Sequence, residues 1–211
     1  MYSKNILSVS WTSTHLCNLK CSHCYGNFGR EINDGEMNTD EIKQLLIDEI
    51  SNMGVKILSI TGGEPTLRSD LFEIISYAKD KGLKVSLATN GTLIDDIMAS
   101  KLKSVHIDRV QVSLEGATEE INDKIRGKGS YKKAIDGIKH LVNNGIYTSL
   151  ALTISKMNKD ELFDFLTLAI KLNVKSINIR FFTPMGRGAS ISSMALGFEE
   201  RKTILQQVVY Y

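Results

Sequence analysis

The sequence predicts an α/β protein, a partial (β/α)6 barrel of the TIM type with parallel strands. Three observations support this fold class: six short segments are β-branched or strictly apolar, helical patterns lie between them, and the two kinds alternate through the 211 residues. Strand–helix units about 30 residues long indicate parallel strands joined by right-handed crossovers. Six units are too few for a complete barrel, so we expect an open one. A six-stranded doubly wound sheet is the alternative.

The predicted strands are bounded by Gly, Asn or Lys residues, as is typical of strand ends. They cover residues 6–12, 56–62, 84–89, 109–115, 148–154 and 176–182. The first helical pattern has Thr39 or Asp40 as its predicted N-cap and Gly54 as its stop signal. The helical patterns cover residues 39–54, 69–82, 130–145, 158–173 and 197–211. No linker or low-complexity tract divides them, so we expect one domain over residues 1–211.

The composition is that of an ordinary globular protein, with 42% hydrophobic and 24% charged residues. The net charge of +2 is too small to indicate binding to nucleic acid or to an anionic membrane. The N-terminal segment has no apolar core with a cleavage site, and no run of about 18 apolar residues predicts a membrane span. We therefore expect no nucleic-acid partner and no membrane association.

All three cysteines of the chain, Cys17, Cys21 and Cys24, follow the first predicted strand in the pattern C-x3-C-x2-C. An odd, clustered set does not suit a disulfide framework and indicates a reducing cytoplasm and a metal or cluster. Thiolates suit soft metals, and His15 or His23 would complete a Cys3His zinc site. A [4Fe–4S] cluster on three cysteines would leave one iron open to a ligand. The cysteine pattern by itself is compatible with both a zinc site and a [4Fe–4S] cluster.

Unusual residues also follow the other predicted strands. The loops after them carry "TGGEPT" (61–66), "ATNGT" (88–92), "SLEGA" (113–117), "TISKMN" (153–158) and "TPMGRG" (183–188). In a parallel βα architecture these loops meet at one rim, where chemistry collects. Arg187, in the last of these loops, is a candidate contact for an anionic substrate.

The C-x3-C-x2-C pattern after the first strand, followed by Gly-Gly-Glu-Pro after the second, resembles the radical S-adenosylmethionine (radical SAM) superfamily. Within it the chain most resembles the core domain of the SPASM/Twitch group, which includes peptide maturases, haem-pathway enzymes and the molybdopterin-precursor enzyme. The segments "ATNG", "VQVSLEGATEEINDKIRG" and "PMGRG" stand where the family places other cofactor contacts. The resemblance reaches about residue 190, and it implies that residues 1–211 are a radical SAM core domain.

The resemblance implies two cofactors. Cys17, Cys21 and Cys24 would ligate a [4Fe–4S] cluster, whose open iron binds S-adenosylmethionine (SAM). Reductive cleavage of SAM would give a 5′-deoxyadenosyl radical that abstracts hydrogen from a peptide or small-molecule substrate, such as a cofactor precursor. An electron donor such as flavodoxin or ferredoxin would serve the cluster. A non-catalytic zinc or iron–sulfur binding module is the alternative function.

The resemblance also implies a set of SAM contacts, while the catalytic residues stay unassigned. These contacts are His23, Gly62, Gly63, Glu64, Thr89, Asn90, Ser113, Glu115 and Arg126. Glu64 would accept a hydrogen bond from the methionine ammonium, and His23 would lie against the adenine. Without the resemblance, Arg126 would be an exposed arginine at a helix end. SPASM-type relatives carry further cysteines downstream, whereas this chain ends in an apolar helix, so we expect a missing C-terminal domain.

Overall fold

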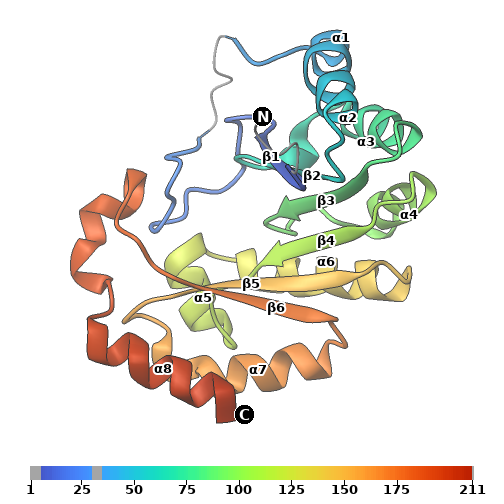
Figure 1. Ribbon diagram of the computed structural model, residues 1–211. Coiled ribbons are helices and arrows are strands. Elements are labelled where there is room, and N and C mark those ends of the chain that lie inside the picture. Colours follow the sequence, from blue (N-terminus) through green and yellow to red (C-terminus); the bar gives the residue numbers. More distant parts are fainter. Residues whose placement is uncertain (1–5, 30–34, 211) are drawn as a thin grey trace.

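A computed structural model describes residues 6–29 and 35–210 of the chain. It contains one six-stranded sheet in the order β1-β2-β3-β4-β5-β6, with all neighbouring strands parallel, and the sheet curls into a half-barrel (Figure 1). The strands are β1 (Ser8–Thr12), β2 (Ile57–Thr61), β3 (Lys84–Thr89), β4 (Arg109–Ser113), β5 (Thr148–Ile154) and β6 (Ser176–Phe181). The strand order never reverses, so the partial barrel is confirmed and the doubly wound alternative is wrong.

The helix predicted at 39–54 runs from Thr39 to Asn52 in three parts, α1 (Thr39–Glu41), the π-helical η1 (Ile42–Asp48) and α2 (Glu49–Asn52). Its N-cap is Asn38, and not Thr39 or Asp40 as predicted. The Asn38 side chain accepts hydrogen bonds from two backbone N–H groups, and the Glu41 side chain accepts one from Asn38 N, which forms a capping box.

The remaining helices follow the other strands. They are η2 (Pro65–Leu67), α3 (Leu71–Asp80), α4 (Asp96–Ser104), α5 (Glu119–Arg126), α6 (Ser130–Asn143), η3 (Lys159–Glu161), α7 (Leu162–Lys171), η4 (Gly186–Met194) and α8 (Phe198–Tyr210). The predicted helical patterns lacked α4 and α5. Of these, α4 buries only Ala99 and Leu102 and so has a weak apolar pattern. Tyr211, the end of the last predicted helix, lies outside the described residues. No described helix has both the length and the apolar character needed to cross a bilayer.

The two faces of the sheet differ in polarity. In β4, Val110 and Val112 are buried in the hydrophobic core, whereas Gln111 and Ser113 alternate with them and line a pocket on the inner face. The other strands repeat this alternation, and the helices cover the outer face (Figure 1). The core therefore lies between strands and helices, and the inner face is left for polar groups.

The carboxyl ends of the strands gather the loops that the sequence singled out. Figure 1 shows the loop after β1, in blue, and the segment after β6, in orange-red, on the same side of the molecule, toward which the strand arrows point. Segments more than 150 residues apart in the chain thus meet at one edge: Gly188 N donates a hydrogen bond to Cys24 O.

Candidate active site

A pocket of about 440 Å³ lies at the carboxyl ends of the strands. This volume is within the range of small-molecule sites. The predicted site residues that line it are Cys17, Cys21, His23, Cys24, Gly62, Gly63, Thr89, Asn90, Ser113, Glu115 and Arg126. Among the predicted site residues, only Glu64 is absent from this lining; its side chain is completely buried. The structure therefore brings together residues that the sequence spreads over four strand–helix units.

Neighbouring loops hold the backbone of the cysteine loop, residues 13–29, from several sides. Ser22 N donates a hydrogen bond of 2.8 Å to Ile125 O in the last turn of α5. After β6, Arg187 donates from one guanidinium nitrogen to Cys21 O and from the other to Phe28 O, at 3.1 and 2.5 Å. Arg187, predicted as a contact for an anionic substrate, is thus engaged within the protein and braces the cysteine loop.

Two glycines after β2 allow the cysteine loop to approach closely. Gly63 N donates a hydrogen bond to Thr14 O, and a Cβ atom on Gly63 would lie 2.3 Å from Leu16 O. Gly62 has a φ of +142°, and its Cβ would lie 2.6 Å from Thr14 O. The prediction assigned both glycines to close approach of a cofactor. In the structure they line the pocket, and they also make room for the backbone that carries the cysteines.

Glu64 joins the loops after β2 and β3. Its carboxylate accepts four hydrogen bonds, from Thr66 N, Thr66 Oγ1, Thr89 Oγ1 and Asn90 N, at 2.6 to 3.1 Å. Burial raises the pKa of Glu64, and these hydrogen bonds offset part of that effect. Asn90 in turn donates to Asn18 Oδ1 in the cysteine loop. The predicted contact of Glu64 with the methionine ammonium stays a prediction, because its carboxylate is occupied inside the protein.

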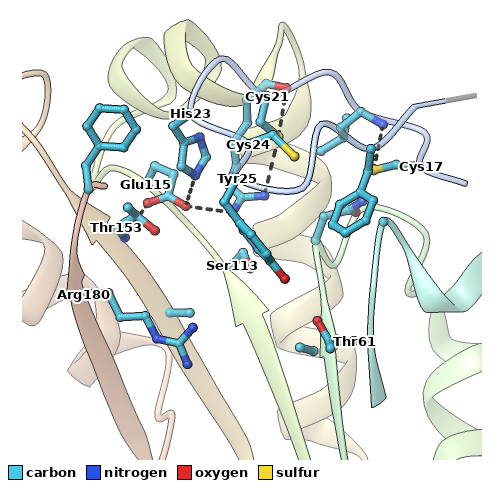
Figure 2. A pocket seen from close by; sticks show the side chains of 18 of the residues that line it. Cys17, Cys21, His23, Cys24, Tyr25, Thr61, Ser113, Glu115, Thr153 and Arg180 are labelled. Carbon is cyan, nitrogen blue, oxygen red and sulfur yellow. Dashed lines mark hydrogen bonds and ion pairs between the residues drawn. The ribbon is translucent and has the colours of Figure 1, made fainter. Parts of the chain in front are cut away.

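Glu115 is the centre of a buried polar cluster (Figure 2). Its Oε1 accepts a hydrogen bond of 2.7 Å from Arg126 Nη2 and lies 3.1 Å from His23 Nε2, and its Oε2 accepts one of 2.6 Å from Thr153 N. Burial alone would raise the pKa of Glu115, but the neighbouring His23 and Arg126 outweigh it and lower the pKa to about 2. Arg126 is only 8% exposed, so the reading of it as an exposed helix-end residue is wrong.

Two buried nitrogen atoms beside the cysteines have no hydrogen-bond partner among the described residues, His23 Nδ1 and Arg126 Nε. An unpaired buried polar atom is costly, so their presence fits a pocket whose polar ligand supplies the partners. Arg126 Nη1 also lies 3.9 Å from Cys21 Sγ. The donor set therefore suits an anionic, polar ligand next to the cysteine sulfur atoms.

The thiols of the cysteine loop open onto this pocket. Burial raises the pKa of both Cys17 and Cys21, so a bound metal would be needed to hold them as thiolates at neutral pH. Within residues 6–29 and 35–210, no three Cys, His, Asp or Glu side chains converge so as to hold a single metal ion. In a cluster each cysteine ligates a different iron atom, so three thiols along the wall of one pocket fit such a group.

Comparison with known proteins places the chain among related sequences. The model of the radical SAM superfamily matches residues 11–169. The AdoMet-dependent heme synthase of Methanosarcina barkeri is 39% identical over 181 residues, covering 85% of this chain and 52% of the relative. The mycofactocin maturase MftC of Mycolicibacterium smegmatis is 36% identical over 186 residues, covering 88% and 47%. The chain thus spans about half the length of the curated relatives it matches.

Solved structures show the same fold. Streptococcus suis SuiB bound to S-adenosylmethionine superposes with a TM-score of 0.82 at 16% identity, covering 96% of this chain and 47% of that chain. SuiB bound to the precursor peptide SuiA has the same TM-score at 17% identity, covering 98% and 47%. The expected further domain after residue 211, and the assignment of residues 1–211 to one core domain, stay predictions.

Proposed function

Because the chain belongs to the radical SAM superfamily, we propose that its pocket holds a [4Fe–4S] cluster and SAM and that the protein is a radical SAM enzyme. When bound, these cofactors supply a reductive cleavage of SAM to methionine and a 5′-deoxyadenosyl radical, which abstracts a hydrogen atom from the substrate. One observation carries the proposal: the three cysteines line the same pocket as the predicted SAM contacts, which come from the cysteine loop itself and from the β2, β3 and β4 units.

Each part of the pocket has its own task in this proposal. Cys17, Cys21 and Cys24 are the cluster ligands, and the braced backbone of their loop fixes where the sulfur atoms lie. Arg126 and His23 turn their unpartnered nitrogen atoms to SAM, while Glu115 keeps both side chains oriented. Ser113, two residues before Glu115 and also in the pocket lining, offers a hydroxyl to the ribose.

Glu64 acts indirectly in the proposed site. By tying the loop after β2 to Thr89, the last residue of β3, and to Asn90, which follows it, Glu64 fixes two walls of the SAM pocket at once. Thr89 and Asn90 also line the pocket, so their hydrogen bonds to Glu64 fix the orientation of their polar atoms. Glu64 is therefore a positioning residue, and any direct hydrogen bond to SAM would come in addition.

The substrate class follows from the relatives, and we propose a peptide or a cofactor precursor. Their names, heme synthase and mycofactocin maturase, and the peptide-bound SuiB structure support both choices. An electron donor of the flavodoxin or ferredoxin type would reduce the cluster. A cytoplasmic location accords with reduced cysteines, which cytosolic conditions maintain.

Anaerobic reconstitution with iron and sulfide tests the proposal. The wild-type chain should turn brown with about four irons per chain, as a [4Fe–4S] cluster requires, and should release 5′-deoxyadenosine when SAM and dithionite are added. Cys17→Ala, Cys21→Ala and Cys24→Ala should each lose both signals. Lys20→Ala, at an exposed position in the same loop, is the matched control and should retain them. A colourless wild-type protein that binds zinc would support the non-catalytic metal module instead.

A further inference from the structure

Arg180, on β6, lines the pocket and was not among the predicted site residues. Its side chain is exposed, and it has no hydrogen-bond or ion-pair partner in the described part of the chain. In Figure 2 the guanidinium extends over the inner face of the strands, and no dashed line reaches it. Arg180 thus presents an unpaired positive charge to the pocket.

The other charged groups of the pocket are already engaged. Arg126 donates to Glu115, and Arg187 donates to two backbone carbonyl groups. Glu115 is the single carboxylate among the described lining residues, and its oxygen atoms are occupied by Arg126, His23 and Thr153 N. No protein carboxylate in this lining is therefore free to neutralise Arg180.

The surroundings of Arg180 are neutral and polar. Thr153 is its direct neighbour across the β5–β6 pair, and Gln111 lies two strands away on the same inner face. Ala151, also in the lining, leaves space between Thr153 and Gln111 because its side chain is a single methyl group. A ligand that reaches Arg180 thus meets hydrogen-bonding groups, while the carboxylate of the described lining, Glu115, is already occupied by Arg126, His23 and Thr153 N.

We propose that Arg180 binds a carboxylate group of the substrate, which makes it the specificity-determining residue of the reaction. The inference rests on the proposed function, since it assigns Arg180 to the substrate of that same site. An unpaired guanidinium offers two parallel N–H groups that match the two oxygen atoms of a carboxylate. A carboxylate also balances one positive charge, whereas a phosphate monoester carries nearly two negative charges at neutral pH.

The position of Arg180 separates it from the proposed SAM contacts. Arg126 is the arginine beside a cysteine sulfur atom, at 3.9 Å from Cys21 Sγ. In the view of Figure 2, Glu115 and His23 lie between Arg180 and the cysteines. The carboxylate that Arg180 meets therefore belongs to the substrate, and not to the methionine part of SAM.

Binding of matched acid and neutral compounds tests the inference. The probes are 3-phenylpropionate and 3-phenylpropionamide, titrated into protein that contains SAM. The wild type should prefer the acid about tenfold or more, the range expected for a charge-assisted hydrogen bond. Arg180→Gln should abolish the preference, and Arg180→Lys should keep part of it. Arg201→Gln is the matched control, because Arg201 packs on the neighbouring Phe181 but is absent from the pocket lining, and it should bind like the wild type.

Two further pairs identify the source of the carboxylate. The first pair is coproporphyrin III, a tetrapyrrole with carboxylate side chains that also gives a related Fe-coproporphyrin III synthase its name, and its methyl ester. The second pair is a peptide with a free or an amidated C terminus. The pair whose acid form gains more from Arg180 shows whether a tetrapyrrole side chain or a peptide terminus is bound.

Three results would overturn the inference. The wild type could bind the phenylpropionate pair equally, or Arg180→Gln could keep the acid preference. Alternatively, Arg180→Gln could weaken SAM binding, which would assign Arg180 to the cofactor. Failure of the proposed function has a different signature: no cluster and no 5′-deoxyadenosine in the wild type, whatever its acid preference.

Discussion

The Arg126 guanidinium donates a 2.7 Å hydrogen bond to the Glu115 carboxylate, and both side chains are buried. Glu115 follows β4, and Arg126 ends α5, whose Ile125 O also accepts a hydrogen bond from Ser22 in the cysteine loop. This ion pair therefore connects the sheet to the loop that carries the proposed cluster ligands. Its loss should affect both folding and the geometry of the site.

Breaking this pair on one side should be costly. Arg126→Gln leaves Glu115 as a buried carboxylate without its arginine partner, which should lower the free energy of unfolding by about 3–5 kcal/mol. The double variant Glu115→Gln/Arg126→Gln should cost less than the sum of the two single changes. Urea unfolding of the cluster-free protein measures both. Lys132→Gln breaks the exposed pair with Glu119 and should have a much smaller effect; equal losses would contradict the prediction.

Glu64→Gln should destabilise the protein even without cofactors. The carboxylate accepts four hydrogen bonds, and the new amide would place an N–H group against one of these donors. We expect the free energy of unfolding to fall by about 1–3 kcal/mol, the cost of an unsatisfied buried group. Denaturant unfolding of the apo-protein is the measurement. Unchanged stability combined with weaker SAM binding would show that Glu64 contacts the cofactor and does not stabilise the protein by joining the loops after β2 and β3.

Arg187→Ala should loosen the cysteine loop. The change removes two charge-assisted hydrogen bonds, to Cys21 O and Phe28 O, so a reconstituted cluster should be lost to a chelator about tenfold faster. Arg187→Lys should resemble the alanine variant, because a single ammonium group cannot bridge both carbonyl groups as the guanidinium does. Arg201→Gln serves as the control. Wild-type cluster retention in Arg187→Lys would argue for a role of charge alone.

Stability should fall at low pH through Asp70. Partial burial would raise the pKa of Asp70, but hydrogen bonds from Arg68 and Thr39 hold it below the ordinary value of 3.8. A lowered pKa contributes stability above pH 3.8, and that contribution is lost as the pH falls below this value. Urea unfolding between about pH 5 and pH 2 should show this loss in the wild type. Asp70→Asn should reduce the slope, and an unchanged slope would contradict the assignment.

The positions of the strands and of the site loops could be predicted because they depend on local pattern. All six strands lie within the predicted segments, and the cysteine loop and "TGGEPT" meet where parallel strand ends must meet. The capping box at Asn38 and Glu41 was present in the sequence and was missed. The weak apolar pattern of α4 gave little signal.

The hydrogen-bond partners of the polar site residues could not be predicted in the same way. Arg180 lies near the end of the last strand and Arg187 follows it, and no local sequence pattern indicates which of the two is paired. Only the folded chain shows that Arg187 is engaged by Cys21 O and Phe28 O while Arg180 has no partner among the described residues. Glu64 is a similar case, because its donors in Thr89 and Asn90 lie a whole strand–helix unit away.

The contrast between the two faces of the sheet has a consequence for how this scaffold can change. Val110 and Val112 supply packing on the outer face, so exchanging Gln111, Thr153 or Arg180 on the inner face removes little of the buried apolar area that maintains the fold. A few substitutions there can redirect the pocket to a new substrate while the cysteine loop keeps its supports. Mutational tolerance is thus expected on the face that carries the proposed substrate contact, and this suits the scaffold to evolutionary reuse.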